Sequence, residues 1–214
     1  MNKEKKRLLI VDDEKPLLDA LVRAFSVAQH FEYEITALLD LKEVVNQEVE
    51  DAEFDICVID LGFGRERDLL GFMALFSRSE LNRADMRIVY SGHPKIKNVV
   101  RAMQLGATDF VSKAEYPPHK LVERVESMLI ERQEREERTQ RIYKFLGEHH
   151  NDLSNLPPGQ VLAITVAEAG PMVAAEGRSR LDALLKYADW RRNQSNAQLP
   201  VVPHLHIVPP KSSQ

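Results

Sequence analysis

Short apolar runs alternate with amphipathic stretches through the first half of the chain. Residues 8–11 and 54–60 are largely apolar, which is typical of strands buried on both faces of a parallel sheet. Residues 15–28 carry apolar side chains at helical spacing, with Pro16 in the first turn, where its missing N–H is tolerated. The same alternation predicts further strands at 33–37, 86–91 and 109–112, and further helices at 41–49, 69–77 and 95–105.

Strand and helix signals that alternate in this way point to one fold class. Parallel strands joined by helices form a doubly wound sheet, in which right-handed crossovers place helices on both faces. We therefore predict an α/β domain with a five-stranded parallel sheet over residues 1–128.

The pattern changes beyond residue 119. Apolar residues keep helical spacing as far as Leu129, but residues 131–138 are almost wholly charged, with both signs mixed. One interpretation is a single solvated helix, held by opposite charges four residues apart. The other is a short coiled-coil seam that joins two chains in a homodimer. Under both interpretations, residues 129–150 form a helical linker.

A small α+β module is predicted for residues 151–214. Residues 160–166 and 172–175 have the pattern of a hairpin, Ser179 followed by Asp182 indicates a helix start, and residues 205–208 predict a closing strand. So short a segment buries only a small core, which favours support from a partner or a dimer mate. Its sequence carries no motif that assigns a function.

Composition narrows the class of protein. The formal net charge of −4 gives no electrostatic reason to expect nucleic-acid binding. The single cysteine, Cys57, lies in a predicted buried strand, which fits a reduced, cytoplasmic setting. No apolar stretch approaches the roughly 20 residues that span a bilayer, and the first apolar run is too short for a signal peptide. We expect a cytoplasmic protein without membrane or nucleic-acid contacts.

Polar side chains stand where the predicted strands end. Asp12 and Asp13 follow the first strand, Asp60 the third, Ser91 ends the fourth, and Lys113 follows the fifth. Because parallel strands release their ends at the carboxyl edge of the sheet, these groups should converge there. Oxygen ligands suit Mg²⁺, and an ammonium pairs with phosphoryl oxygens. The pattern predicts a pocket for a divalent cation and a phosphoryl group.

This ordered set resembles the receiver domain of two-component response regulators. The resemblance runs from about residue 6 to residue 128, and is carried by residues 9–14, 58–60, 89–92 and 106–113. It implies the flavodoxin-like receiver fold and the work of a response regulator in a phosphorelay. Such a protein accepts a phosphoryl group from a histidine kinase or phosphotransfer protein, and then changes its protein–protein contacts or its dimerisation. The resemblance therefore leads us to expect a switch and not a stand-alone enzyme.

The resemblance also implies roles for single residues. Asp60 would be the phosphoacceptor, Ser91 and Lys113 would bind phosphoryl oxygens, and Phe110 would be the aromatic switch residue. The implied Mg²⁺ ligands are the carboxylates of Asp12, Asp13 and Asp60 and the backbone carbonyl of Gly62.

Two departures from the family pattern bear on function. Residues 64–67 (Gly-Arg-Glu-Arg) lie in an insertion after Asp60, and the family's usual proline in that loop is absent. Ala114 stands where the family normally has a proline after a cis bond. A cis bond before a non-proline residue costs about 3 kcal/mol, so we expect a trans bond and a different pose for Lys113. These departures leave a second function open, that of a constitutive receiver-fold adaptor that does not cycle phosphate.

Overall fold

The chain forms two compact units, comprising Met1–Met128 and Leu129–Gln214. The computed structural model describes residues 3–39, 54–62, 84, 86–92, 94–149, 153, 155–167, 170–194 and 199–209. The helices predicted at 41–49 and 69–77, and the insertion at residues 64–67, lie outside these described residues.

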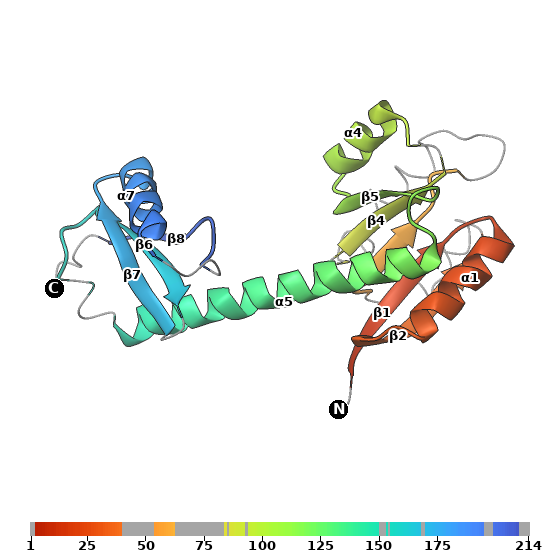
Figure 1. Cartoon of the computed structure of the whole chain (residues 1–214), viewed down its shortest axis with the longest axis horizontal. Coiled ribbons are helices and arrows are strands. Elements are labelled where there is room, and N and C mark those ends of the chain that lie inside the picture. Colours follow the sequence, from red (N-terminus) through yellow and green to blue (C-terminus); the bar gives the residue numbers. More distant parts are fainter. Residues whose placement is uncertain are drawn as a thin grey trace. The chain divides into compact units, whose positions relative to one another are not determined.

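One parallel sheet forms the centre of the first unit (Figure 1). The strand order is β2-β1-β3-β4-β5, and each neighbouring pair is parallel, which confirms the predicted doubly wound sheet. The strands are β1 (Glu4–Val11), β2 (Phe31–Leu38), β3 (Ile56–Ile59), β4 (Met86–Ser91) and β5 (Asp109–Ser112).

Strand β1 begins earlier than its apolar run. Its first residues, from Glu4 to Arg7, are mostly exposed and pair with the start of β2, from Phe31 to Glu34. Backbone pairing with β2 extends the strand to Glu4. The prediction started at residue 8 because it was based on the apolar run alone.

Helices cover both faces of this sheet (Figure 1). They are α1 (Lys15–Ser26), α4 (Ile96–Gln104) and the first turns of α5 (Pro118–Glu148). Helix α4 stops where predicted, because Gly106 has a φ of 92°. Glycine adopts this left-handed conformation without the steric penalty of a side chain, as is common just beyond a helix end.

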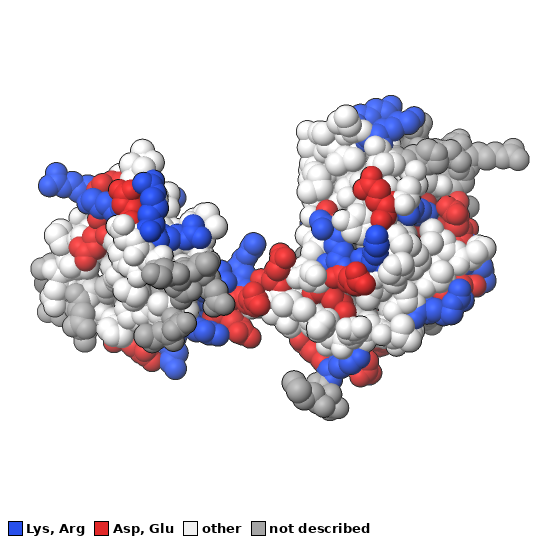
Figure 2. Space-filling model, viewed as in Figure 1, with Lys and Arg blue, Asp and Glu red and all other residues white. Residues whose placement is uncertain are grey.

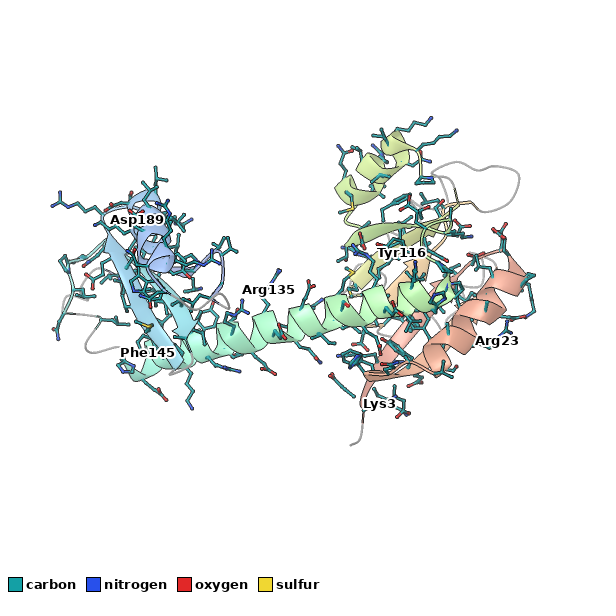
Figure 3. All side chains as sticks on the ribbon, viewed as in Figure 1. Lys3, Arg23, Tyr116, Arg135, Phe145 and Asp189 are labelled. Carbon is teal, nitrogen blue, oxygen red and sulfur yellow. The ribbon has the colours of Figure 1, made fainter. Side chains whose placement is uncertain are left out.

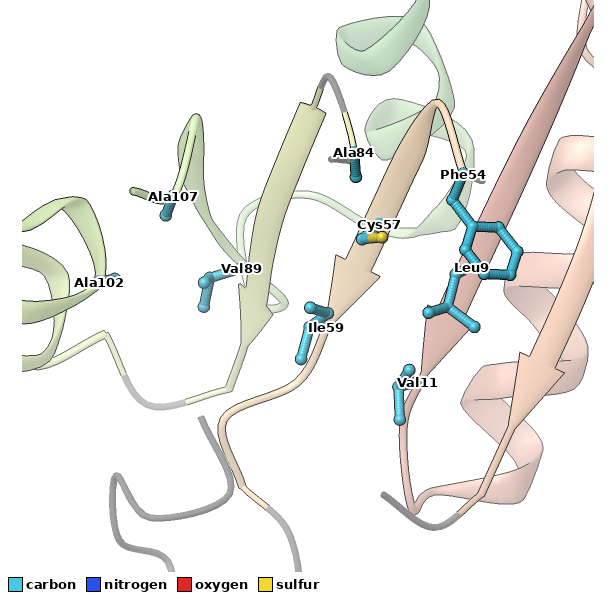
Figure 4. Close-up of a cluster of buried hydrophobic side chains, with 9 residues drawn as sticks. All are labelled: Leu9, Val11, Phe54, Cys57, Ile59, Ala84, Val89, Ala102 and Ala107. Carbon is cyan, nitrogen blue, oxygen red and sulfur yellow. The ribbon is translucent and has the colours of Figure 1, made fainter. Parts of the chain in front are cut away.

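The core follows the alternation of side chains along the strands. Figure 4 shows the cluster on the α4 side of the sheet. Leu8, Ile10 and Val58 alternate to the other face, where α1 contributes Leu18 and Leu21. The α4-side cluster comprises Leu9, Val11, Phe54, Cys57, Ile59, Ala84, Val89, Ala102 and Ala107.

The buried thiol of Cys57 should be inert in the folded protein. Burial raises the pKa of Cys57 to about 12, so the reactive thiolate is scarce at mildly alkaline pH. Because the folded pKa is raised, the stability linked to the neutral thiol is fully present below the ordinary pKa of a thiol and is lost as the pH rises from there through the folded pKa. We expect a thiol-reactive dye to label Cys57 in denaturant and hardly at all in native protein. Rapid labelling of the native protein would contradict this.

The second unit is built on a small antiparallel sheet in the order β7-β6-β8. Helix α7 (Arg180–Arg192) begins at the predicted cap, where the Ser179 hydroxyl oxygen accepts a hydrogen bond from the backbone N–H of Asp182. The predicted hairpin, helix and closing strand are all present. The strands are β6 (Val161–Ala167), β7 (Gly170–Gly177) and β8 (His204–Ile207).

Helix α5 changes character along its length. Its middle carries exposed charges of both signs, visible in Figure 2, and includes Arg135, labelled in Figure 3. Ion pairs four residues apart join Arg132 to Glu136 at 2.8 Å and Glu137 to Arg141 at 3.3 Å. Nearer its end, Ile142 packs with buried residues of β6. None of the described helices is both long and apolar enough to cross a membrane.

Candidate functional site

Backbone pairing brings two acids together at the carboxyl edge of the sheet. The N–H of Asp12 donates to the Leu38 carbonyl at 3.1 Å, which continues the β1–β2 ladder. The N–H of Asp60 donates to the Val11 carbonyl at 2.9 Å, which continues the β1–β3 ladder. Both carboxylates are buried, with exposed fractions of 1% for Asp12 and 6% for Asp60. The sheet therefore fixes two carboxylates in a site with little water.

Lys113 ties these carboxylates together. Its Nζ lies 2.8 Å from Asp60 Oδ2 and 2.8 Å from Asp12 Oδ2. The backbone N–H of Lys113 donates to the Ser91 carbonyl at 2.9 Å, which places the residue just beyond β5. The ammonium thus offsets part of the negative charge that two neighbouring carboxylates bring into the site.

Burial and neighbouring charges oppose each other at this site. Burial raises the pKa of Asp12, while Lys113 and a hydrogen bond from the Glu14 N–H act to lower it, and the charge of Asp60 adds to the rise. Burial also works against the charged form of Lys113, but its bonds to Asp12 and Asp60 outweigh this, and its pKa is raised. Lys113 therefore stays cationic throughout the physiological range.

Three carboxylates are close enough to hold one metal ion. One oxygen each of Asp12, Asp13 and Asp60 lies within 4.8 Å of the others. The buried Oδ1 of Asp60 has no hydrogen-bond partner among the described residues, so it is open to a cation. An all-oxygen donor set fits a hard divalent ion such as Mg²⁺, with water completing its coordination.

Two glycines border this carboxylate site. A Cβ added to Gly62 would lie 3.3 Å from Asp60 Oδ2, so a side chain there would crowd the carboxylate. A Cβ on Gly92 would meet only the Lys113 side chain, at 3.9 Å. The absence of side chains at both positions keeps space beside Asp60 and Lys113.

The structure places the other predicted site residues around the same edge. Ser91 is buried at the end of β4 and lies opposite Ser112 of β5 in the sheet register. Phe110 lies opposite Val89 and packs, half-buried, against the cluster on the α4 side. Because Phe110 is two residues before Ser112 on the same strand, it shares a sheet face with Ser91.

Two contacts of Lys113 were not predicted from the sequence. The exposed Glu14 places Oε1 3.2 Å from the ammonium, which gives Lys113 a third carboxylate partner. The ring of the buried Tyr90 lies 5.9 Å from Nζ, and its hydroxyl donates to the Tyr116 carbonyl at 2.6 Å. Glu14 directly follows the paired acids, and this adjacency was a signal in the sequence. Nothing in the sequence pairs Tyr90 with Lys113.

Ala114 does not displace Lys113. No peptide bond among the described residues is cis, so the bond before Ala114 is trans, as expected. Lys113 Nζ nevertheless reaches Asp60, at the distance given above. We expected the trans bond to give Lys113 a different pose. The ammonium nevertheless contacts the carboxylates of both Asp12 and Asp60.

Several solved structures are similar to this chain. A CheY-like receiver domain protein from Methanospirillum hungatei JF-1 is 24% identical, covers 62% of this chain and 99% of its own, and superposes with a TM-score of 0.50. The receiver domain of NarL from Mycobacterium tuberculosis is 20% identical, with coverages of 58% and 96% and a TM-score of 0.47. A Mn²⁺-bound form of response regulator Rcp1 is 17% identical, with coverages of 57% and 92% and a TM-score of 0.48.

The comparison with curated proteins gave no match. The family model of the response regulator receiver domain matches residues 8–126, which is more than half of the chain. This range contains the whole parallel sheet from Leu8 onward and every residue of the acidic site. The chain therefore belongs to the response regulator receiver domain family.

Proposed function

We propose that this chain is the response regulator of a phosphorelay and that Asp60 is its phosphoacceptor. The proposal is based on the burial and the contacts of the Asp60 carboxylate. It is buried, one oxygen is held by Lys113, and the other has no hydrogen-bond partner among the described residues. A positioned, poorly hydrated carboxylate has two oxygens for these roles, because one can attack phosphorus while the other binds the metal.

The reaction would move a phosphoryl group from a phosphohistidine to Asp60. A bond forms between a carboxylate oxygen and phosphorus, the phosphorus–nitrogen bond of the donor breaks, and the released imidazole takes up a proton. The donor would be a histidine kinase or a phosphotransfer protein. Lys113 would neutralise charge on the phosphoryl oxygens, and Ser91 would donate a hydrogen bond to one of them. Mg²⁺, held by Asp12, Asp13, Asp60 and the Gly62 carbonyl, would supply further charge neutralisation.

The output would be a change in protein–protein contacts and not a chemical product. Ser91 and Phe110 share one sheet face, so movement of Ser91 toward a phosphoryl oxygen would free space for the Phe110 ring. In this proposal the protein is a cytoplasmic switch, and dimerisation through α5 is one way to read out its state. The charged middle of α5 already pairs within the chain, so a dimer seam there would have to replace those pairs.

The direct test is phosphoryl uptake from a small donor. The full chain is incubated with acetyl phosphate and Mg²⁺, and intact mass is recorded over time. We expect a gain of one phosphoryl group, and no gain when a chelator removes the metal. An unchanged mass under both conditions would reject the proposal.

The constitutive adaptor remains the alternative function, and beryllofluoride separates it from the switch. This phosphoryl mimic should change the spectra of residues around Ser91 and Phe110 in a switch, and should alter the oligomeric state if dimerisation is the output. An adaptor would show neither change.

The metal affinity of this site should fall on acidification. Because burial raises the pKa of Asp12, this carboxyl is protonated at a higher pH than an ordinary aspartate, and a proton competes with the metal. In the metal-free protein the same shift means that stability is highest with Asp12 protonated and is lost as the pH rises through the folded pKa. Calorimetric titration with Mg²⁺ should therefore give a rising Kd from neutral to acidic pH. An Asp12→Asn variant should show a flatter profile, and identical profiles would contradict the assignment.

A further inference from the structure

Glu14 contacts Lys113 but has no role in the phosphoryl transfer proposed above. Its Oε1 accepts a hydrogen bond from Lys113 Nζ at 3.2 Å, while Asp12 Oδ2 and Asp60 Oδ2 each lie 2.8 Å from the same nitrogen. These carboxylates outnumber the ammonium, so the group keeps a net negative charge. The Glu14 side chain is 65% exposed, so it adds this charge on the solvent side of the site.

The backbone of Glu14 is fixed by the fold. Its N–H donates to Asp12 Oδ1 at 2.9 Å, and its carbonyl accepts hydrogen bonds from the N–H groups of Leu17 and Leu18, both at 2.9 Å. Glu14 stands at the N-cap position of α1, but its side chain makes no cap hydrogen bond. The carboxylate is therefore held beside the site without serving the helix, and its charge can be removed while α1 stays intact.

A phosphoryl oxygen has to compete with Glu14 for Lys113. An ammonium has three N–H groups, and carboxylates already surround this one. Asp12 and Asp60 are buried and continue the strand ladders, so their contacts are the harder ones to replace. Lys15, the neighbouring cation, is paired with another carboxylate of α1. Glu14 is thus the carboxylate that gives way at Lys113, and its charge stays close by.

The charge of Glu14 is close enough to repel a phosphoryl donor. A phosphoryl oxygen that binds Lys113 Nζ at about 2.8 Å would lie within about 6 Å of Glu14 Oε1, because that oxygen is 3.2 Å from Nζ. At about 6 Å in water, Coulomb's law gives roughly a threefold effect for each unit of charge on the donor. A dianionic donor should therefore be disfavoured about tenfold, and less in high salt.

We propose that Glu14 determines donor specificity, by favouring phosphoryl groups attached to a protonated nitrogen over dianionic acyl phosphates. A protonated nitrogen cancels one negative charge of the phosphoryl group, so such a donor is repelled less by Glu14. In both reactions an oxygen of Asp60 bonds to phosphorus. An acyl phosphate loses its bridging phosphorus–oxygen bond and releases a carboxylate, whereas the nitrogen donor loses its phosphorus–nitrogen bond and releases the neutral amine. The proposal rests on the phosphoacceptor role of Asp60.

Two small donors of different charge test the proposal on the full chain. Acetyl phosphate is a dianion at neutral pH, whereas phosphoramidate carries a protonated nitrogen and a single net negative charge. Labelling rates are followed by intact mass over a range of donor concentrations, with Mg²⁺ saturating for each variant. Glu14→Gln should raise the second-order rate constant about tenfold for acetyl phosphate and about threefold for phosphoramidate. Both gains should shrink as salt is added.

Further variants separate charge from structure. Glu14→Asp keeps the charge and should keep the parent's ratio of the two rate constants. The matched control Glu34→Gln removes an exposed carboxylate from the first half of β2 and should change neither rate. Equal gains with both donors, unchanged rates or slower labelling of Glu14→Gln would overturn the specificity role alone. A parent chain that neither donor labels would instead reject Asp60 as the phosphoacceptor, and this proposal with it. Circular dichroism confirms that each variant is folded.

Discussion

Asp60→Asn is expected to take up no phosphoryl group from acetyl phosphate under conditions in which the parent chain becomes fully labelled. The amide nitrogen and carbonyl of asparagine lack the charge and nucleophilicity of a carboxylate, so the loss should be complete and not partial. The substitution keeps the size of a side chain that lies between Lys113 and the ends of β1 and β3. Intact mass after incubation with Mg²⁺ and the donor is the measurement.

The matched control for this experiment is Asp19→Asn. Asp19 is a surface carboxylate on α1 that pairs with Lys15 at 2.8 Å, away from the acidic site. This variant should be labelled as fast as the parent. Labelling of Asp60→Asn at the parent rate would place the acceptor elsewhere and would remove the basis of the proposed switch.

Gly177→Ala should destabilise the second unit strongly. A Cβ at this buried position would lie 2.8 Å from Ala183 Cα and 3.0 Å from Ala183 Cβ. The obstacle is helix backbone, which the Ser179 cap holds in place, so it cannot move aside as a flexible side chain could. Overpacking of this kind costs about 1–3 kcal/mol, and contact with backbone favours the upper end.

The fluorescence of Trp190 reports this effect. Trp190 is the single tryptophan of the chain and lies on α7 beside Tyr187, in the second unit. Denaturant titration followed by its emission should show an earlier midpoint for Gly177→Ala. The matched control is Gly147→Ala on α5, where an added Cβ meets nothing within 4 Å and should stabilise the helix by about 0.5–1 kcal/mol. Equal midpoints for the two variants would contradict the packing argument.

Much of the first unit was predictable because its strands are short and buried on both sides. Such strands must be apolar throughout, so β3 and β4 stand out in the sequence as runs that end in a polar residue. The same rule predicts from the sequence alone that Asp60 and Ser91 lie at the carboxyl edge. The order of the strands was not predicted, because right-handed crossovers are compatible with more than one order of parallel strands.

Other features depend on contacts that leave no local trace. The first half of β1 is polar and is a strand only because β2 pairs with it. Glu126 is buried although it is charged, since its carboxylate accepts hydrogen bonds from the N–H groups of His30 and Phe31 at 2.8 and 3.2 Å. Neither the polar half of β1 nor the burial of Glu126 produces a repeating pattern of apolar residues, so neither could be predicted from the sequence.

By itself, the sequence determined which residues end the parallel strands, because burial on both faces permits only apolar side chains up to the edge. It thereby determined that the carboxyl edge of the sheet carries Asp12, Asp13, Asp60, Ser91 and Lys113. The tertiary structure decided how they meet. Distances between the ends of different strands depend on register and backbone pairing, and these place Lys113 within 2.8 Å of two buried carboxylates while leaving Asp60 Oδ1 open. It also decided the contact between Glu14 and Lys113, since only folding brings these two residues together.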